Sequence, residues 1–243
     1  MRPPSGARLP SNFCGRDMRK TSQSKLLAKW LREVGVDFVP RSFPKNKDES
    51  MPDSTSAETE TLDDIQQELV GCKGCVLCKK RNKIVFGVGN PRAQLMFVGE
   101  APGAEEDLQG KPFVGAAGKR LDRWIESIGL TREDVYIANI VKCRPPGNDV
   151  PNPEEAQSCM PYLIRQIRVI RPKLLCTLGA TALRYMLGVD ERITKVRGRW
   201  RDWNGISLLP TYHPAFILRN PSREQEVFED FKDLARRLSL SEA

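Results

Sequence analysis

Residues 98–115 read VGEAPGAEEDLQGKPFVG, and this stretch decides how the rest of the chain is interpreted. It begins at the end of an apolar run that predicts a buried strand, and Glu100 stands where that strand stops. Pro102 and Gly103 end the strand, because proline lacks an amide donor and glycine opens unusual backbone angles. Phe113 is an isolated aromatic residue in the loop that follows. Together these features predict a pocket wall, with an ordinary strand-to-helix connection as the alternative.

Composition restricts the possible partners and the cellular location. The 243 residues carry a formal net charge of +8 and a pI near 9.2, which favours a polyanionic partner such as nucleic acid. The sequence contains no apolar run of about 18 residues and no apolar segment typical of a secretory signal. We therefore expect a cytoplasmic protein, whose thiols stay reduced, so the seven cysteines indicate metal or redox chemistry more than disulfides.

Two zones divide the chain. Residues 1–60 are rich in Pro, Ser, Lys and Asp, and they predict an N-terminal extension with one short helix at 22–34 and a flexible linker. Residues 61–243 form the predicted main domain, which opens with a short amphipathic helix.

The main domain alternates between strand-like and helical patterns. Apolar runs predict strands at 94–98, 135–141, 173–178 and 206–211, and amphipathic patterns predict helices at 117–128, 153–170, 181–187 and 223–238. This alternation predicts an α/β fold, a three-layer α/β/α sandwich with a central four-stranded parallel sheet.

Polar side chains stand at the ends of three predicted strands. Glu100, Asn139 and His213, the only histidine, are expected to meet at one edge, because open parallel sheets bind ligands beyond their carboxyl ends. An amide matches the imide edge of a pyrimidine, an imidazole stabilises an oxygen that gains negative charge, and Phe113 can stack on a flat ring. These parts suit removal of a base from its sugar after the nucleotide flips out of the duplex. A packed histidine without chemistry is the alternative.

Four sequence blocks carry a specific resemblance over about residues 65–238. They are GEAPGAEED at 99–107, FVGAAG at 113–118, NIVKCRPPGN at 139–148 and YHPAFILRNP at 212–221. Together they resemble the motifs of the family 4 uracil-DNA glycosylases, the iron–sulfur type of bacteria and archaea. The resemblance implies the uracil-glycosylase fold, hydrolysis of the N-glycosidic bond of deoxyuridine in DNA, and release of uracil in base-excision repair.

The resemblance also implies site roles. Phe113 is expected to stack on uracil, Asn139 to read its edge, and His213 to stabilise the departing anion near uracil O2. Glu100, a catalytic candidate, and the backbone of Ala101 line the same pocket. Many glycosylases of the best-studied family carry an aspartate at the position of Ala101, so that water-activating carboxylate is missing here. The implied minor-groove wedge comprises Leu218, Arg219 and Asn220.

The cysteines follow the same pattern. Four thiolates can hold a [4Fe-4S] cluster or a zinc ion, and spacing alone leaves both possible. The resemblance selects a structural [4Fe-4S] cluster held by Cys72, Cys75, Cys143 and Cys159. Of the others, Cys78 is expected to be a neighbour and not a ligand, Cys176 a core residue, and Cys14 has no assigned role. Basic residues around the ligands are expected to contact DNA phosphates: Lys73, Lys79, Lys80, Arg81, Lys142 and Arg144.

Other classes of function stay open at this point. One is an iron–sulfur DNA-binding or electron-transfer protein without glycosylase turnover, and another is a noncatalytic binder of damaged DNA. Loop 104–112 contains no histidine, so the covalent uracil-trapping relative of this family is not expected. The expected partner is uracil-containing DNA, bound by a monomer away from membranes.

Overall fold

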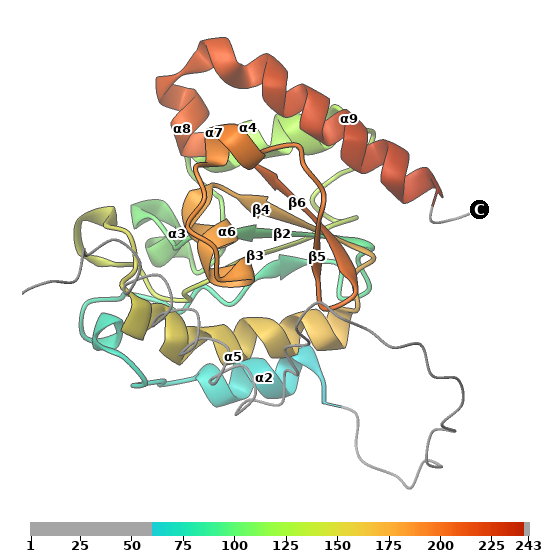
Figure 1. Ribbon diagram of the computed structural model, residues 1–243. Coiled ribbons are helices and arrows are strands. Elements are labelled where there is room, and N and C mark those ends of the chain that lie inside the picture. Colours follow the sequence, from blue (N-terminus) through green and yellow to red (C-terminus); the bar gives the residue numbers. More distant parts are fainter. Residues whose placement is uncertain (1–59, 241–243) are drawn as a thin grey trace, which may run out of the picture. The chain divides into compact units, whose positions relative to one another are not determined.

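The structure is a computed structural model, and residues 60–240 are described (Figure 1). The predicted helix at 22–34 and the predicted linker lie outside the described residues. Within residues 60–240 no helix has both the length and the apolar character needed to cross a membrane.

A six-stranded sheet forms the centre of the fold, in the order β1-β3-β2-β4-β6-β5. The four predicted strands form its parallel middle, and two short antiparallel strands extend it at the edges. The edge strands have only two and three residues, too few to show a periodic pattern in the sequence. The strands are β1 (Val88–Gly89), β2 (Leu95–Gly99), β3 (Tyr136–Asn139), β4 (Leu174–Leu178), β5 (Arg201–Trp203) and β6 (Ile206–Thr211).

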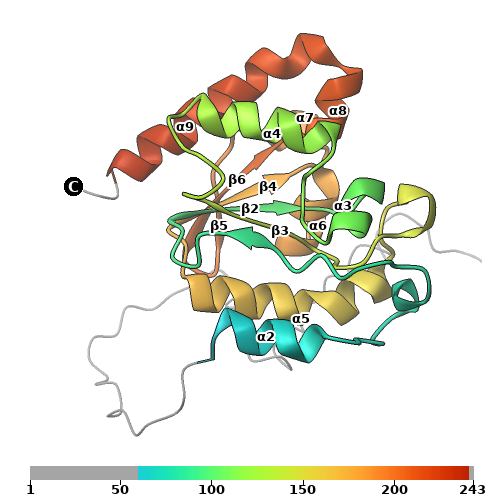
Figure 2. The same cartoon turned by 180° about the vertical axis from the view of Figure 1, so that it is seen from behind.

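Helices cover both faces of the sheet, which confirms the predicted three-layer α/β/α architecture. Figures 1 and 2 show α4, α8 and α9 over one face, and α2 and α5 over the other. The helices are α2 (Leu62–Leu69), α3 (Ala104–Gln109), α4 (Ala116–Glu126), α5 (Pro153–Ile170), α6 (Ala180–Leu187), α7 (Ile193–Val196), α8 (Pro214–Arg219) and α9 (Glu224–Leu240). Short 3-10 turns occupy Val76–Lys79, Pro146–Asn148 and Pro221–Arg223.

Helix α5 begins and ends where the sequence predicts. Asn152 accepts a hydrogen bond from the Glu155 amide, and Glu155 in turn accepts one from the Asn152 amide, which is the reciprocal capping-box pattern. Pro153 occupies the first turn, where its missing amide hydrogen is not needed.

The larger core lies between the sheet and the layer of α4, α8 and α9. Phe97 of β2 stacks on Phe231 of α9 with ring centroids 5.5 Å apart, and Trp124 of α4 packs on the same ring at 5.7 Å. All three side chains are fully buried. On the other side, Ile65 and Leu69 fasten α2 within a smaller apolar cluster. Burial of this kind holds the strand ends in fixed positions relative to one another.

Strand register places the candidate residues at one edge. Gly99, the last residue of β2, pairs with Asn139, the last residue of β3. Leu178 at the end of β4 likewise pairs with Thr211 at the end of β6, two residues before His213. Because all four strands are parallel, their carboxyl ends share one edge of the sheet.

Candidate active site at the carboxyl edge of the sheet

Asn139 and Phe113 meet around Gly99. A Cβ atom at Gly99 would lie 2.4 Å from Asn139 Oδ1 and 2.6 Å from Phe113 Cζ, so glycine is required for this approach. Asn139 is 1% exposed, and its Oδ1 atom has no hydrogen-bond partner. An unpaired buried polar atom costs about 1–3 kcal/mol. Such a cost is expected where a ligand supplies the missing hydrogen.

The His213 ring also lies next to Phe113, with the two ring centroids 5.7 Å apart. Its Nδ1 accepts a hydrogen bond of 3.1 Å from the Ala215 amide and so caps α8. The pKa of His213 is lowered to about 4, first by withdrawal from solvent and then by the charge of Arg219, while Glu106 opposes the shift. The imidazole is therefore neutral at pH 7, and with Nδ1 accepting, its proton is on Nε2.

The backbone of Phe113 is held in a conformation unusual for this residue type. Its φ angle is 52°, in the left-handed region. Arg132 donates hydrogen bonds to the carbonyls of Phe113 (2.6 Å) and Pro112 (2.7 Å), and Asp122 orients the guanidinium at 3.1 Å. A Cβ at Gly118 would lie 1.8 Å from the Phe113 carbonyl oxygen, so helix α4 also needs its glycine. These contacts fix the direction of the aromatic ring.

Glu106 joins the two ends of the pocket loop. Its carboxylate accepts hydrogen bonds from the amides of Gly103 (3.1 Å), Val114 (2.9 Å) and Gly115 (3.0 Å). Sequence reasoning did not assign a role to this residue. The sequence does contain a signal for this role. Glu106 stands three residues after Gly103, the N-cap of α3, and an acidic side chain at that position commonly accepts a hydrogen bond from the N-cap amide.

Glu100 and Ala101 follow Gly99 directly and are both half-buried. The main-chain oxygen of Glu100 accepts a hydrogen bond from the Val141 amide at 3.3 Å. Its carboxylate acts on Tyr185 of α6: burial raises the pKa of Tyr185, and the charge of Glu100 adds to the rise. The carboxylate therefore lies on the α6 side of the site.

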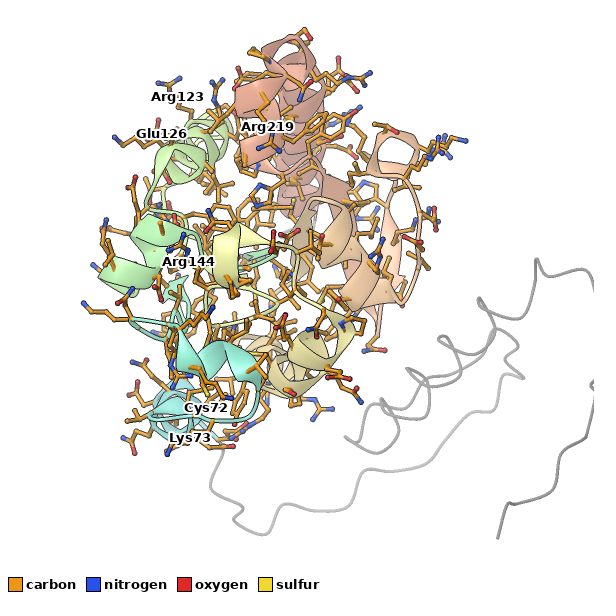
Figure 3. The ribbon with its side chains drawn as sticks, turned by 90° about the vertical axis from the view of Figure 1, so that its left-hand side faces the viewer. Cys72, Lys73, Arg123, Glu126, Arg144 and Arg219 are labelled. Carbon is orange, nitrogen blue, oxygen red and sulfur yellow. The ribbon has the colours of Figure 1, made fainter. Side chains whose placement is uncertain are left out.

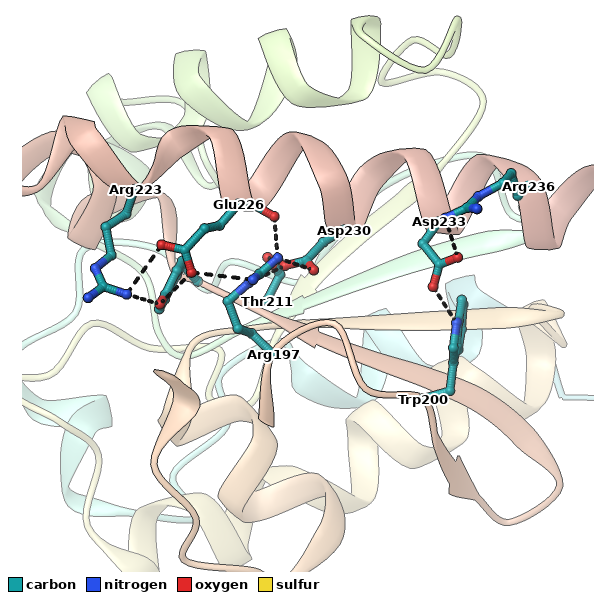
Figure 4. A network of polar contacts seen from close by, with 9 residues as sticks. Arg197, Trp200, Thr211, Arg223, Glu226, Asp230, Asp233 and Arg236 are labelled. Carbon is teal, nitrogen blue, oxygen red and sulfur yellow. Dashed lines mark hydrogen bonds and ion pairs between the residues drawn. The ribbon is translucent and has the colours of Figure 1, made fainter. Parts of the chain in front are cut away.

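A buried polar network braces the end of β6 just before His213 (Figure 4). Asp230 of α9, 2% exposed, accepts hydrogen bonds from Thr211 at 2.6 Å and from Arg197 at 2.9 and 2.5 Å. The Arg197 guanidinium also lies 5.7 Å from the centre of the Tyr212 ring. The two residues that precede His213 are thus tied to α9.

The four predicted cysteine ligands lie close enough to influence one another. Burial raises the pKa of Cys159 to about 11, Lys142 opposes that rise, and Cys143 and Cys75 add to it. Burial likewise raises the pKa of Cys143, which Arg81 opposes and Cys75 and Cys72 increase. All six cysteines among the described residues are free thiols.

Three of the four sulfurs accept hydrogen bonds. The donors are the Gly74 amide to Cys72 (3.4 Å), the Arg81 guanidinium to Cys143 (3.3 Å) and the Lys142 amide to Cys159 (3.2 Å). Such bonds are typical of thiolates in iron–sulfur sites, where they set the properties of the cluster.

The residues predicted to contact phosphate separate into two groups. Lys142 is 0% exposed, so the prediction that it contacts DNA is wrong. Arg81 holds the Cys72 carbonyl at 2.7 Å as well as Cys143, so it braces the cysteine loop. Lys73, Lys79 and Lys80 are exposed, and Arg144 is half-buried. Figure 3 shows Lys73, Arg144 and Arg219 spread across the face that contains the strand ends.

Helix α8 carries the predicted wedge. Leu218 is 38% exposed, and Arg219 beside it is exposed. The amide of Asn220 donates a hydrogen bond to the Phe216 carbonyl at 2.9 Å, so its side chain closes the end of α8.

Comparison with known proteins gives the class. Residues 86–236 match the model of the Uracil DNA glycosylase superfamily. Type-4 uracil-DNA glycosylase from Saccharolobus solfataricus is 48% identical over 189 residues, covering 74% of this chain and 88% of that protein. The Archaeoglobus fulgidus enzyme of the same name is 45% identical over 183 residues, covering 72% and 92%. The one from Thermotoga maritima is 45% identical over 177 residues, covering 71% and 92%.

The matched segment contains the strand ends, the pocket loop and helix α8. The chain belongs to the uracil-DNA glycosylase superfamily and, within it, to the type-4 group.

Proposed function

We propose that this protein hydrolyses the N-glycosidic bond of deoxyuridine in DNA, releasing uracil and leaving an abasic site. The protein is a uracil-DNA glycosylase, a hydrolase of N-glycosyl bonds that serves DNA repair. The single observation that carries the site assignment is the buried, unpaired Oδ1 of Asn139, which lies beside the Phe113 ring at Gly99.

The side-chain amide of Asn139 can recognise uracil through two hydrogen bonds. Uracil offers an N3–H donor and an O4 acceptor on adjacent ring positions. Asn139 supplies the matching pair, Oδ1 to accept from N3 and Nδ2 to donate to O4. Cytosine has no N3–H and carries an amino group at C4, so it would leave both groups of a buried amide mismatched. Sites built on hydrogen bonds discriminate strongly for this reason. Phe113 supplies the stacking surface.

Bond cleavage creates charge that the site is arranged to accept. When the C1′–N1 bond breaks, its electron pair passes to uracil and accumulates partly on O2. The neutral His213 ring offers Nε2–H as a donor to that oxygen, and a fixed donor costs no reorganisation during the reaction. A water oxygen then bonds to C1′ and loses one proton, and the uracil anion takes up one proton, so that a C1′ hydroxyl and neutral uracil result. Glu100 is proposed to orient this water or to favour the cationic sugar, because Ala101 has no carboxylate.

DNA is proposed to lie across the face shown in Figure 3. Leu218 would fill the space left by the flipped nucleotide, and Arg219 and Lys73 would contact phosphates. Asn220 stays in the proposed DNA-contacting segment through its main chain, since its side chain caps α8. We further propose that the protein acts as a monomer.

The decisive experiment is a uracil-release assay on duplex DNA that contains one U·G pair. We expect release of free uracil and an alkali-sensitive abasic site. A matched duplex with a C·G pair serves as the control and should stay intact. If the wild-type protein releases no uracil from the U·G duplex, the proposed function is wrong.

We propose that Cys72, Cys75, Cys143 and Cys159 hold a structural [4Fe-4S] cluster. Four cysteine thiolates are the usual ligand set of such a cluster, each binding a different iron. Cys143 and Cys159 lie close enough to Cys75 for the three thiols to influence one another's pKa, and Cys72 also acts on Cys143. When bound, the cluster would connect the loop before β1, the end of β3 and helix α5.

Metal analysis of anaerobically purified protein tests this proposal. We expect about four iron and four sulfide per chain, as in other Cys₄ clusters. Cys143→Ser should lose most of both, whereas the matched Cys78→Ser should retain them. Stoichiometric zinc without sulfide would contradict the cluster assignment. A redox-active cluster in a protein that releases no uracil would instead favour the electron-transfer class.

A further inference from the structure

Lys142 lies three residues after Asn139 and directly before Cys143, and its side chain is completely buried. The Nζ atom donates hydrogen bonds to the main-chain oxygen of Asn139 at 3.0 Å and to Gln166 Oε1 at 2.6 Å. Both acceptors are uncharged. The lysine therefore gains no ion-pair energy from them, and it contacts no solvent.

This placement is costly by ordinary rules. Moving an ammonium group out of water costs several kcal/mol even after the protein relaxes, and buried lysines are usually paired with a carboxylate. An apolar side chain of similar length would fill the same volume at lower cost. Contact with DNA phosphate does not explain Lys142, because the side chain does not reach the surface. The hydrogen bonds themselves are what an apolar residue would lack.

Those bonds connect the pocket to rigid elements. Gln166 of α5 is also fully buried, and its Nε2 donates to the Phe86 carbonyl at 3.0 Å and to the Tyr136 hydroxyl at 3.3 Å. The chain from Asn139 through Lys142 and Gln166 thus reaches α5 and the start of β3. Buried networks of hydrogen bonds such as this one make a local structure rigid.

The main chain of Lys142 makes a second connection. Its amide donates to Cys159 Sγ at 3.2 Å, so the residue contacts the cysteine site and the pocket residue at once. Val85 also donates to the Lys142 carbonyl at 2.8 Å, which fixes this peptide from the other side.

We propose that Lys142 is a positioning residue for uracil recognition, which holds the Asn139 carbonyl and thereby fixes the direction of the Asn139 carboxamide. The inference rests on the proposed function. Asn139 ends β3, and the peptide that follows it is held on its amide side by the Ile140 hydrogen bond to the Gly99 carbonyl at 3.0 Å and on its carbonyl side by Lys142. Any shift of the Asn139 main chain carries its Cα–Cβ bond with it, and a displacement of about 1 Å at a reacting group can cost about 10²-fold in rate. Lys142 restrains that shift at the Asn139 carbonyl.

Lys142→Met tests the proposal, because methionine keeps the length and removes the donors. Lys232→Met, on the exposed side of α9, is the matched control for loss of a lysine. Two dissociation constants are measured, for free uracil and for DNA that contains an abasic site. We expect Lys142→Met to weaken uracil binding about tenfold or more, with abasic-DNA binding within about twofold of wild type. Iron content should stay at the wild-type level.

Gln166→Leu gives a second route, should Lys142→Met fail to fold. It leaves the lysine in place and removes its anchor, so uracil binding should weaken by a smaller factor. Equal uracil affinity in either folded variant and wild type would overturn the proposal. A parallel loss of uracil binding, abasic-DNA binding and folded protein would also overturn it, as a general structural defect. Wild-type protein and Asn139→Ala are assayed alongside, so that failure of the proposed function appears as absence of wild-type uracil release.

Discussion

Replacing His213 by alanine is expected to lower kcat for uracil release by about 10²–10³-fold, with little change in KM. Removal of one preorganised donor to a developing oxyanion typically has this effect. The donor acts mainly after the C1′–N1 bond has begun to break, so substrate binding should be nearly unaffected. Single-turnover kinetics on uracil-containing duplex DNA measures the change. Wild-type kcat in His213→Ala would contradict the assigned role.

The pH dependence provides an independent check on the same residue. The pKa of His213 is lowered to about 4, chiefly by burial, so the ring is neutral above that value and binds a proton below it. Protonated Nδ1 can no longer accept the Ala215 amide, and the start of α8 should loosen. We expect His213 to leave kcat/KM independent of pH from 8 to about 5 and to reduce it as pH approaches 4. His213→Gln should lack this acid limb.

The lowered pKa of His213 also determines how the stability of the fold depends on pH. Unfolded histidine has a pKa of about 6.5, so between that pH and about 4 the unfolded chain binds more protons than the folded chain. Stability should therefore increase with pH across this window through His213. Urea titrations of wild type and His213→Gln at pH 5 and pH 7.5 would measure the difference, which should be smaller in the variant.

Asn139→Ala is expected to lower kcat/KM for uracil release by about 10³-fold. Two buried hydrogen bonds to uracil are lost, each worth up to about 2 kcal/mol. Asn139→Asp should also lose most activity, because a carboxylate cannot donate to O4. Activity is measured on the U·G duplex at enzyme concentrations above and below KM, so that binding and chemistry are separated.

Asn139→Ala is expected to lower activity without lowering the free energy of unfolding. Asn139 Oδ1 is buried without a partner, and removing such an atom relieves a cost. We therefore expect Asn139→Ala to unfold at the same or a higher urea concentration than wild type, apart from the small cavity it leaves. Thr177→Val is the matched control, because Thr177 Oγ1 is also buried and unpaired, on strand β4, which is separated from β3 by β2. It should preserve activity. A strongly destabilised Asn139→Ala would show that Asn139 is structural and not kept for the ligand.

Local patterns predicted most of the framework. Each central strand had an apolar run long enough to recognise, and α5 had a complete set of start signals in Asn152, Pro153 and Glu155. Edge strands β1 and β5 escaped prediction because they are only two and three residues long. Helix α8 also escaped, although His213 and Pro214 are a cap and a first-turn proline, because its six residues give less than two turns of pattern.

What the sequence by itself determined is the order of strands and helices, and hence that Glu100, Asn139 and His213 lie at or just beyond strand ends at one edge. Parallel topology is sufficient for that step, because it needs no knowledge of side-chain contacts. The tertiary structure decided how the edge becomes a pocket. Arg132 holds Phe113 from 19 residues away, Gln166 holds Lys142 from 24, and Arg81 reaches Cys143 across 62. Such contacts leave no local periodicity in the sequence, so a lysine that looks like a phosphate ligand is revealed as a buried support only by the packing around it.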